Sequence, residues 1–252
     1  MTDVAISVAN LRVAYGDTEI LHGIGFTVAW GEVRGYLGPN GAGKSTTIRA
    51  LVGLQAPTSG ELRIAGFDPV REAMRARAGF GYVPDAGGLF TLLTPQEHLA
   101  LVADLHDLAR DVAAARIDAM IARFGLAAFL TRRIDTLSKG QRQRVALACG
   151  LLHEPRVWLL DEPMDGLDVE GAVALRKAVR EHADRGGAVL YCSHVLDVVE
   201  RLCDRTLILA AGHVVADAPT RELVARSADR RLETVFQQLV RSDAELRRAL
   251  EA

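Results

Sequence analysis

The chain has 252 residues, enough for one large domain or for one domain with a subdomain. Hydrophobic residues make up 49% and charged residues 25%, which excludes an intrinsically disordered chain. Because 30 Lys and Arg face 32 Asp and Glu, we expect no nucleic-acid partner bound through bulk positive charge. Neither a secretion signal nor an apolar run of about 18 residues is visible, so a soluble, cytoplasmic chain is expected.

The first 85 residues carry mainly strand patterns. Turn residues separate short stretches of strand-like composition at positions 6–13, 24–28, 32–37, 62–64 and 78–83. The first three stretches predict an antiparallel β layer at the N-terminus. Residues 44–54 have helical spacing and end at a segment rich in Pro, Ser and Gly.

A helical block follows. Thr94 is a candidate helix cap, and Pro95 is a residue type of the first helical turn. Farther along, hydrophobic residues recur at helical spacing at positions 117, 120, 121 and 124. Strand patterns are nearly absent from residues 86–137, which predicts a helical subdomain inserted into an α/β core.

The α/β core then resumes. The apolar run 157–160, between Pro155 and Asp161, predicts a strand buried on both faces of a parallel sheet. Further helices and strands are expected at 172–183, 188–192, 195–202, 206–209 and 213–215. An apolar stripe predicts a C-terminal helix packed on the domain, formed by Leu232, Val235, Phe236, Leu239 and Val240.

These patterns divide one α/β domain into four consecutive parts. They are an N-terminal β layer with the first part of the core (1–85), a helical subdomain (86–150), the remainder of the core (151–218) and a C-terminal helical tail (219–252).

Residues 38–45 match the pattern Gly-x-x-x-x-Gly-Lys-Ser/Thr between a predicted strand and a predicted helix. Glycines let several backbone N–H groups converge on a phosphate, and the helix N-terminus adds its dipole. Lys44 supplies a charge for the β- and γ-phosphates, and the Ser45 hydroxyl is a candidate Mg²⁺ ligand. A chance Gly-rich turn is the alternative, which the flanking strand and helix disfavour. The predicted nucleotide-binding residues are Gly38, Pro39, Asn40, Gly41, Ala42, Gly43, Lys44, Ser45 and Thr46.

Two carboxylates follow the predicted buried strand 157–160. Ligands of open α/β sheets bind at the carboxyl ends of strands, so Asp161 is a candidate for Mg²⁺ coordination. Glu162 is a candidate for orienting and deprotonating an attacking water. Alone, the pair could be a solvated turn; together with the phosphate loop, it predicts a hydrolase site.

The order of motifs points to a family. Leu137-Ser138-Lys139-Gly140-Gln141 lies between the phosphate loop and the acidic pair, and Ser193-His194 follows. In this order the sequence resembles the ATPase subunits of ABC transporters over residues 4–240. The resemblance implies an α/β P-loop ATPase core with an N-terminal antiparallel β layer and an inserted α-helical subdomain, and it implies ATP and Mg²⁺ as ligands.

The resemblance also implies residue roles. Tyr15 would stack on adenine, and Asp168 would lie in a loop crossing a dimer interface. Lys44, Glu162 and His194 form the implied catalytic set. The implied signature, which would contact ATP held by the other subunit, comprises Ser138, Lys139, Gly140 and Gln141.

Two positions depart from the family pattern. Lys139 stands where a Gly is usual, and Asp85 stands where a Gln that touches Mg²⁺ and water is usual. Asp85 can still bind Mg²⁺ but loses the amide donor, so the implied metal ligands are Ser45, Asp85 and Asp161.

The resemblance implies partners as well. They are a second ATPase subunit, expected to be an identical copy, and a separate transmembrane permease. The permease would hold the chain at the inner face of the membrane, and residues 92–99 resemble bacterial exporter subunits. A soluble ABC-type ATPase is the alternative, although such proteins usually carry two cassettes or large insertions. A small-molecule kinase is a third class, which would lack residues 137–141 and release no phosphate without an acceptor.

Overall fold

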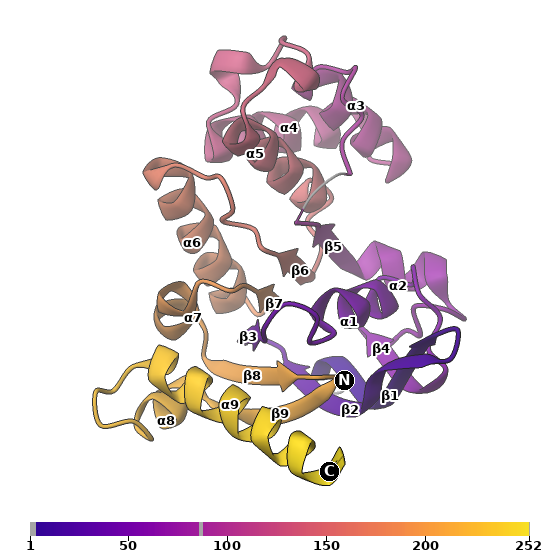
Figure 1. The fold of residues 1–252 in the computed structure, drawn as a ribbon. Helices are drawn as coiled ribbons and strands as arrows, with labels where there is room; N and C mark the ends of the chain where they lie inside the picture. Colours follow the sequence, from indigo (N-terminus) through magenta and orange to yellow (C-terminus); the bar gives the residue numbers. More distant parts are fainter. Residues whose placement is uncertain (1–3, 86–87, 252) are drawn as a thin grey trace.

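The structure, a computed structural model, describes residues 4–85 and 88–251. Two β-sheets form its framework (Figure 1). An antiparallel sheet has the order β2-β1-β4 and contains β1 (Val4–Tyr15), β2 (Thr18–Ala29) and β4 (Ser59–Ile64). The other sheet has the order β5-β6-β7-β3-β8-β9, in which only the β8–β9 pair is antiparallel. Its strands are β3 (Val33–Leu37), β5 (Phe80–Val83), β6 (Val157–Asp161), β7 (Ala188–Cys192), β8 (Arg205–Ala210) and β9 (His213–Pro219).

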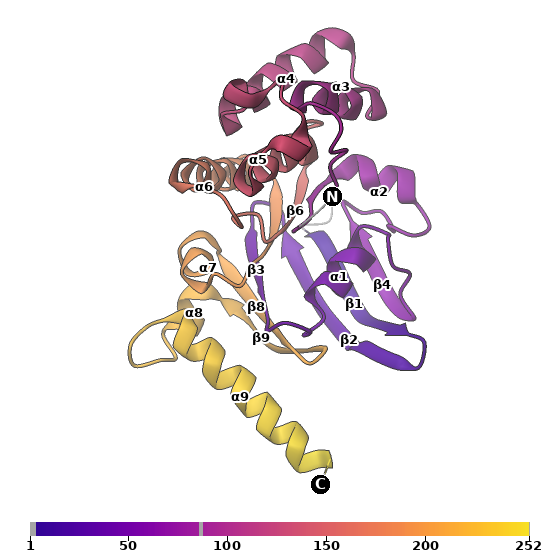
Figure 2. The ribbon, with the colours of Figure 1, turned by 45° about the horizontal axis from the view of Figure 1, so that its top comes forward.

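Helices cover both sheets and form a separate group at one end. They are α1 (Lys44–Leu51), α2 (Ala73–Gly79), α3 (Pro95–Leu105), α4 (Arg110–Phe124), α5 (Lys139–Leu151), α6 (Val169–Asp184), α7 (Leu196–Leu202), α8 (Thr220–Val224) and α9 (Leu232–Glu251). Figure 1 shows α3, α4 and α5 together at the top, and Figure 2 shows the end of α9 extending away from the sheets. Among the described residues, no helix combines the length and the apolar composition required to cross a bilayer.

The parallel strands separate two hydrophobic cores. β3, β6 and β7 are buried along their whole length, and successive side chains point to opposite faces. In β3, Tyr36 joins the core shared with α1 and the antiparallel sheet, whereas Leu37 joins the core under α5, α6 and α7. Burial on both faces fixes the strand register, and with it the sheet edge where the strands end.

The helical subdomain predicted from the sequence is confirmed. The Thr94 side chain accepts from the backbone N–H of Glu97, and the Glu97 carboxylate accepts from the N–H of Thr94, so α3 begins with a capping box. Met120 and Phe124 are buried, and α4 ends at Gly125 in the left-handed conformation.

Two strand predictions need correction. Residues 32–37 were expected in the antiparallel layer, but β3 pairs in parallel with β7 and β8. These partners lie more than 150 residues later, so no local pattern reveals them. Ala78 and Gly79 were expected in a strand, but they end α2, whose buried Ala76 anchors it, and β5 begins at Phe80.

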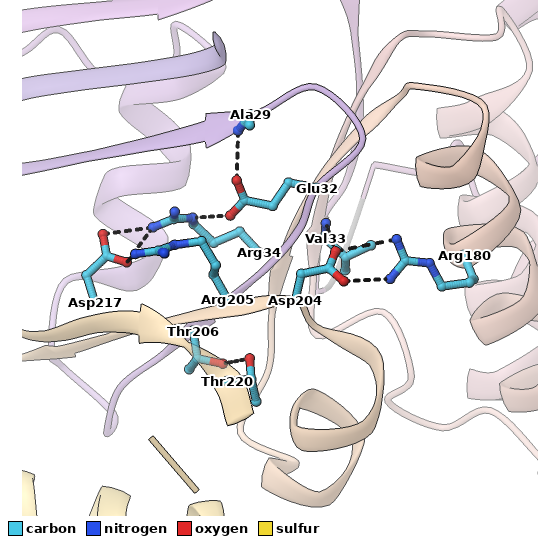
Figure 3. A network of polar contacts seen from close by, with 10 residues as sticks. All are labelled: Ala29, Glu32, Val33, Arg34, Arg180, Asp204, Arg205, Thr206, Asp217 and Thr220. Carbon is cyan, nitrogen blue, oxygen red and sulfur yellow. Dashed lines mark hydrogen bonds and ion pairs between the residues drawn. The ribbon is translucent and has the colours of Figure 1, made fainter. Parts of the chain in front are cut away.

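A polar network holds the start of β3 (Figure 3). The Arg34 side chain, 4% exposed, donates to Glu32 Oε1 at 2.7 Å and to both carboxylate oxygens of Asp217 at 2.8 Å. Asp204 Oδ2 accepts from the backbone N–H of Val33 at 2.8 Å and pairs with Arg180 of α6. The network therefore ties β3 to β8, β9 and α6 at the end opposite the phosphate loop.

Candidate active site

The phosphate loop, residues 38–45, joins the end of β3 to the start of α1. Gly43 caps α1 with φ 106°, and a Cβ there would lie 2.6 Å from the Leu21 side chain. Gly41 also has a positive φ, 78°. The loop therefore takes a path that other residues would strain, and it leaves the first N–H groups of α1 available to an anion.

The side chains that follow the loop fix the start of α1. Lys44 Nζ donates to the carbonyl oxygens of Gly38 at 2.5 Å and Pro39 at 3.2 Å, which holds the ammonium group over the loop. Ser45 is exposed, and Thr46 is buried. The hydroxyl of Thr47, which sequence reasoning did not single out, donates to the Gly43 carbonyl oxygen at 3.0 Å.

The two carboxylates lie in different environments at the end of β6. Asp161 is buried, and this burial, followed by the nearby Glu162 and Asp85 carboxylates, raises its pKa to about 6. Lys44 and Arg49 oppose the rise. A buried carboxylate among other carboxylates favours a cation as its partner. Among the described residues no three His, Cys, Asp or Glu side chains form a metal cluster, so Asp161 suits Mg²⁺, which takes few protein ligands and keeps several waters.

Glu162 and His194 meet directly. Glu162 Oε2 lies 2.8 Å from His194 Nδ1 and accepts from the Ser193 hydroxyl and the backbone N–H of His194 at 3.2 Å each. The positive φ of Glu162, 45°, is uncommon for this residue type and marks backbone strain at the site. Parallel pairing of β6 with β7 places both residues at the same sheet edge.

Residues 137–141, here named the signature segment, form the start of α5. The Ser138 hydroxyl accepts from the backbone N–H of Gln141 at 3.2 Å, and Gln141 Oε1 accepts from the N–H of Ser138 at 3.0 Å. Ser138 is therefore the N-cap of α5, whose first helical residue is Lys139. A Cβ on Gly140 would lie 2.2 Å from the Gly166 carbonyl oxygen, so only glycine permits this approach.

The loop before α6 is tied to α5 by charge. Lys139 Nζ pairs with Asp165 at 2.5 Å, and Arg144 pairs with Asp168. Asp168 also caps α6 by accepting from the backbone N–H of Gly171 at 2.8 Å. Although Asp168 is exposed, its carboxylate therefore stabilises the start of α6 within a single chain.

Asp85 lies two residues after the end of β5. It is exposed and shares a cavity of about 300 Å³ with Lys139, Arg142 and Gln143. The pKa of Lys139 is raised first by its bond to Asp165 and further by Asp85. The Asp85 charge therefore acts on both Lys139 and Asp161.

Tyr15 and Phe236 lie in different surroundings. Tyr15, the predicted adenine platform, is exposed at the end of β1. Phe236 of α9 lines a cavity of about 320 Å³ together with the phosphate loop and His194. The sequence predicted that Phe236 packs on the domain, which is confirmed, but its spacing gives no signal that it also lines this cavity.

Known proteins with similar sequences are transporter subunits. A family model for ABC transporters matches residues 21–165, more than half of the chain. The daunorubicin resistance ATP-binding protein DrrA3 of Streptomyces coeruleorubidus is 37% identical over 94% of this chain and 75% of its own length. The Nod factor export ATP-binding protein I of Rhizobium meliloti is 35% identical over 88% of this chain and 66% of its own.

Solved structures agree with the sequence comparisons. An ATP-binding subunit of an ABC transporter matches with a TM-score of 0.87 and 32% identity, covering 93% of this chain and 99% of that one. A bacterial Atm1-family ABC exporter with ATP bound gives 0.80 and 27%, over 94% and 42%. The fold, the family model and the relatives together show that this chain belongs to the ABC transporter family, as an ATP-binding subunit with ATPase activity.

Proposed function

We propose that two copies of this chain bind Mg-ATP head to tail and that hydrolysis at this interface powers an exporter. Each site would combine the phosphate loop of one copy with the signature segment of the other. The observation that carries the proposal is the Glu162 carboxylate, held 2.8 Å from Nδ1 of His194, which lines one cavity with the phosphate loop. An acceptor in this position suits removal of a proton from an attacking water.

Each residue has a proposed task in phosphoryl transfer. Lys44 and the N–H groups at the start of α1 would neutralise charge on the transferring phosphoryl group. Glu162 would orient the water and accept its proton, while His194 would hold Glu162 and the γ-phosphate together. Asp161 and Ser45, with Asp85 nearby, would hold Mg²⁺, which supplies positive charge against the triphosphate oxygens when it is bound.

The separation of the two anion-binding elements supports a head-to-tail pair. The phosphate loop follows β3, whereas Ser138 caps α5 in the upper group of helices (Figure 1). In the described part of the chain, the cavity at the phosphate loop and the cavity beside Lys139 share no lining residue. Both observations support a model in which each copy carries two half-sites and a second copy would complete each of them.

Complementation tests the head-to-tail arrangement. Lys44→Ala removes the charge of the phosphate loop, and Ser138→Glu places a negative charge at the signature segment, so each variant alone should be inactive. A mixture of the two should recover magnesium-dependent phosphate release, because one of the two sites in a mixed pair is intact. No recovery in mixtures shown to contain mixed pairs would contradict the proposal.

A second experiment tests the role of Glu162. Glu162→Gln should bind ATP and pair in its presence while phosphate release slows by about 100-fold or more, because general-base catalysis contributes at least about that factor. The matched control is Glu170→Gln, an exposed carboxylate on α6, which should hydrolyse ATP normally. Equal turnover of both variants would remove Glu162 from the proposed role.

Export and a permease partner rest on the relatives. DrrA3 is described as a resistance protein, and the Rhizobium protein as part of Nod factor export. We expect a membrane protein to be recovered with this chain from detergent extracts. Recovery of the chain from these extracts without any membrane protein would favour a soluble role.

A further inference from the structure

The C-terminal helix α9 is connected to the loop that carries His194. The backbone N–H of Leu232 donates to Glu200 Oε2 of α7 at 2.8 Å, and Leu232 and Val235 are buried in the core. α7 begins at Leu196, two residues after His194. The seating of α9 and the position of His194 are therefore linked through one short helix.

Phe236 extends this link to the phosphate loop. The cavity of about 320 Å³ that it lines is otherwise formed by Leu37, Gly38, Pro39, Asn40, Ser193, His194 and Leu196. Among the described side chains of α9, Phe236 alone lines this cavity. Leu239, one turn farther along, packs on the same core but does not line the cavity.

The groups next to Phe236 are not fixed by burial. Asn40 is exposed, and the His194 side chain is 66% exposed, with Glu162 as its close contact. An aromatic ring is large and rigid, and the Phe236 side chain forms one wall of the cavity that both segments border. Removing the ring would enlarge the cavity and give the phosphate loop and the imidazole room to move.

We propose that Phe236 is a positioning residue for hydrolysis: its ring keeps the phosphate loop and His194 in the arrangement in which His194 meets Glu162. The inference rests on the proposed function, because it concerns the same site. α9 would thereby control hydrolysis, since a change that lifts α9 from the core also withdraws the ring.

Kinetics of three variants in the full-length chain test the inference. Phe236→Ala should lower kcat about tenfold, because small displacements of catalytic groups are costly, while KM for ATP stays within about twofold. Leu239→Ala, the matched control, removes a similar core contact from α9 and should lower the melting temperature without a comparable loss of kcat. Phe236→Leu, which keeps most of the apolar volume, should give an intermediate kcat.

The outcomes separate this inference from the proposed function. If Phe236→Ala does not fold, Phe236→Leu decides, because its kcat should fall below that of Leu239→Ala despite a smaller loss of melting temperature. Equal kcat values for the variants at the two positions, or a parallel loss of kcat and melting temperature in both, would overturn the inference alone. Absence of magnesium-dependent hydrolysis by the unaltered pair would overturn both.

Discussion

Asp161 should make the nucleotide-free chain less stable at neutral pH than it is in acid. In the folded chain its pKa is about 6 instead of the ordinary 3.8, chiefly because of burial. Between these values the folded chain keeps a proton that the unfolded chain has lost, so stability falls as the pH rises through this window. The difference is about two pH units, and at about 1.4 kcal/mol per unit the loss is about 3 kcal/mol.

Asp161→Asn removes this titration, so its stability relative to the unaltered chain should rise by about 2 kcal/mol between pH 4 and pH 7, the part of the window that this range covers. Urea unfolding followed by circular dichroism without nucleotide, repeated across this range, measures the difference. Asp118→Asn, at an exposed position of α4, is the control and should show no such rise. A stability difference for Asp161→Asn that does not change with pH would refute the reasoning, whatever its size at one pH.

Three further predictions concern charge and close packing. Arg34→Met should lower the free energy of unfolding by about 3 kcal/mol, the low end for breaking a buried ion pair. Arg201→Met, which removes an exposed ion pair, should lower it by less than about 0.5 kcal/mol. Equal losses for the two variants in urea unfolding would contradict this difference. Gly140→Ala would place a Cβ 2.2 Å from a backbone oxygen. This variant should lower kcat at least about tenfold while each copy still binds a fluorescent ATP analogue. Normal turnover would exclude the close approach. The effects of Asp85→Asn and Lys139→Gln on kcat/KM should be non-additive, because both charged side chains line one cavity. A double-mutant cycle should give a coupling energy of at least about 0.5 kcal/mol. Additive effects would show that the two charges act separately.

The elements that carry the site follow from local sequence. The apolar run before Asp161 predicts a strand buried on both faces, and the glycine spacing at residues 38–45 predicts a turn between strand and helix. Once these strands are parallel, topology alone brings the phosphate loop, Asp161, Glu162 and His194 to one sheet edge. Their chemical roles remain predictions that the experiments above address.

Long-range contacts could not be predicted in the same way. The sheet to which β3 belongs is decided by β7 and β8, far along the chain, and its alternating pattern fits either sheet. Arg34 reads as an ordinary strand residue until Asp217 is placed beside it. Phe236 occupies a core position in a helical stripe, and only the folded chain brings it to the phosphate loop.

Helix α5 can act as a lever. It runs without a break from the signature segment to Leu151, and near its far end Cys149 Sγ lies 3.4 Å from Nδ1 of the buried His98 of α3. Its 13 residues span about 20 Å, so a tilt of about 10° at the Leu151 end moves Ser138 by about 3 Å. A displacement of that size is comparable to the length of a hydrogen bond, so a small push at one end can make or break a contact at the other.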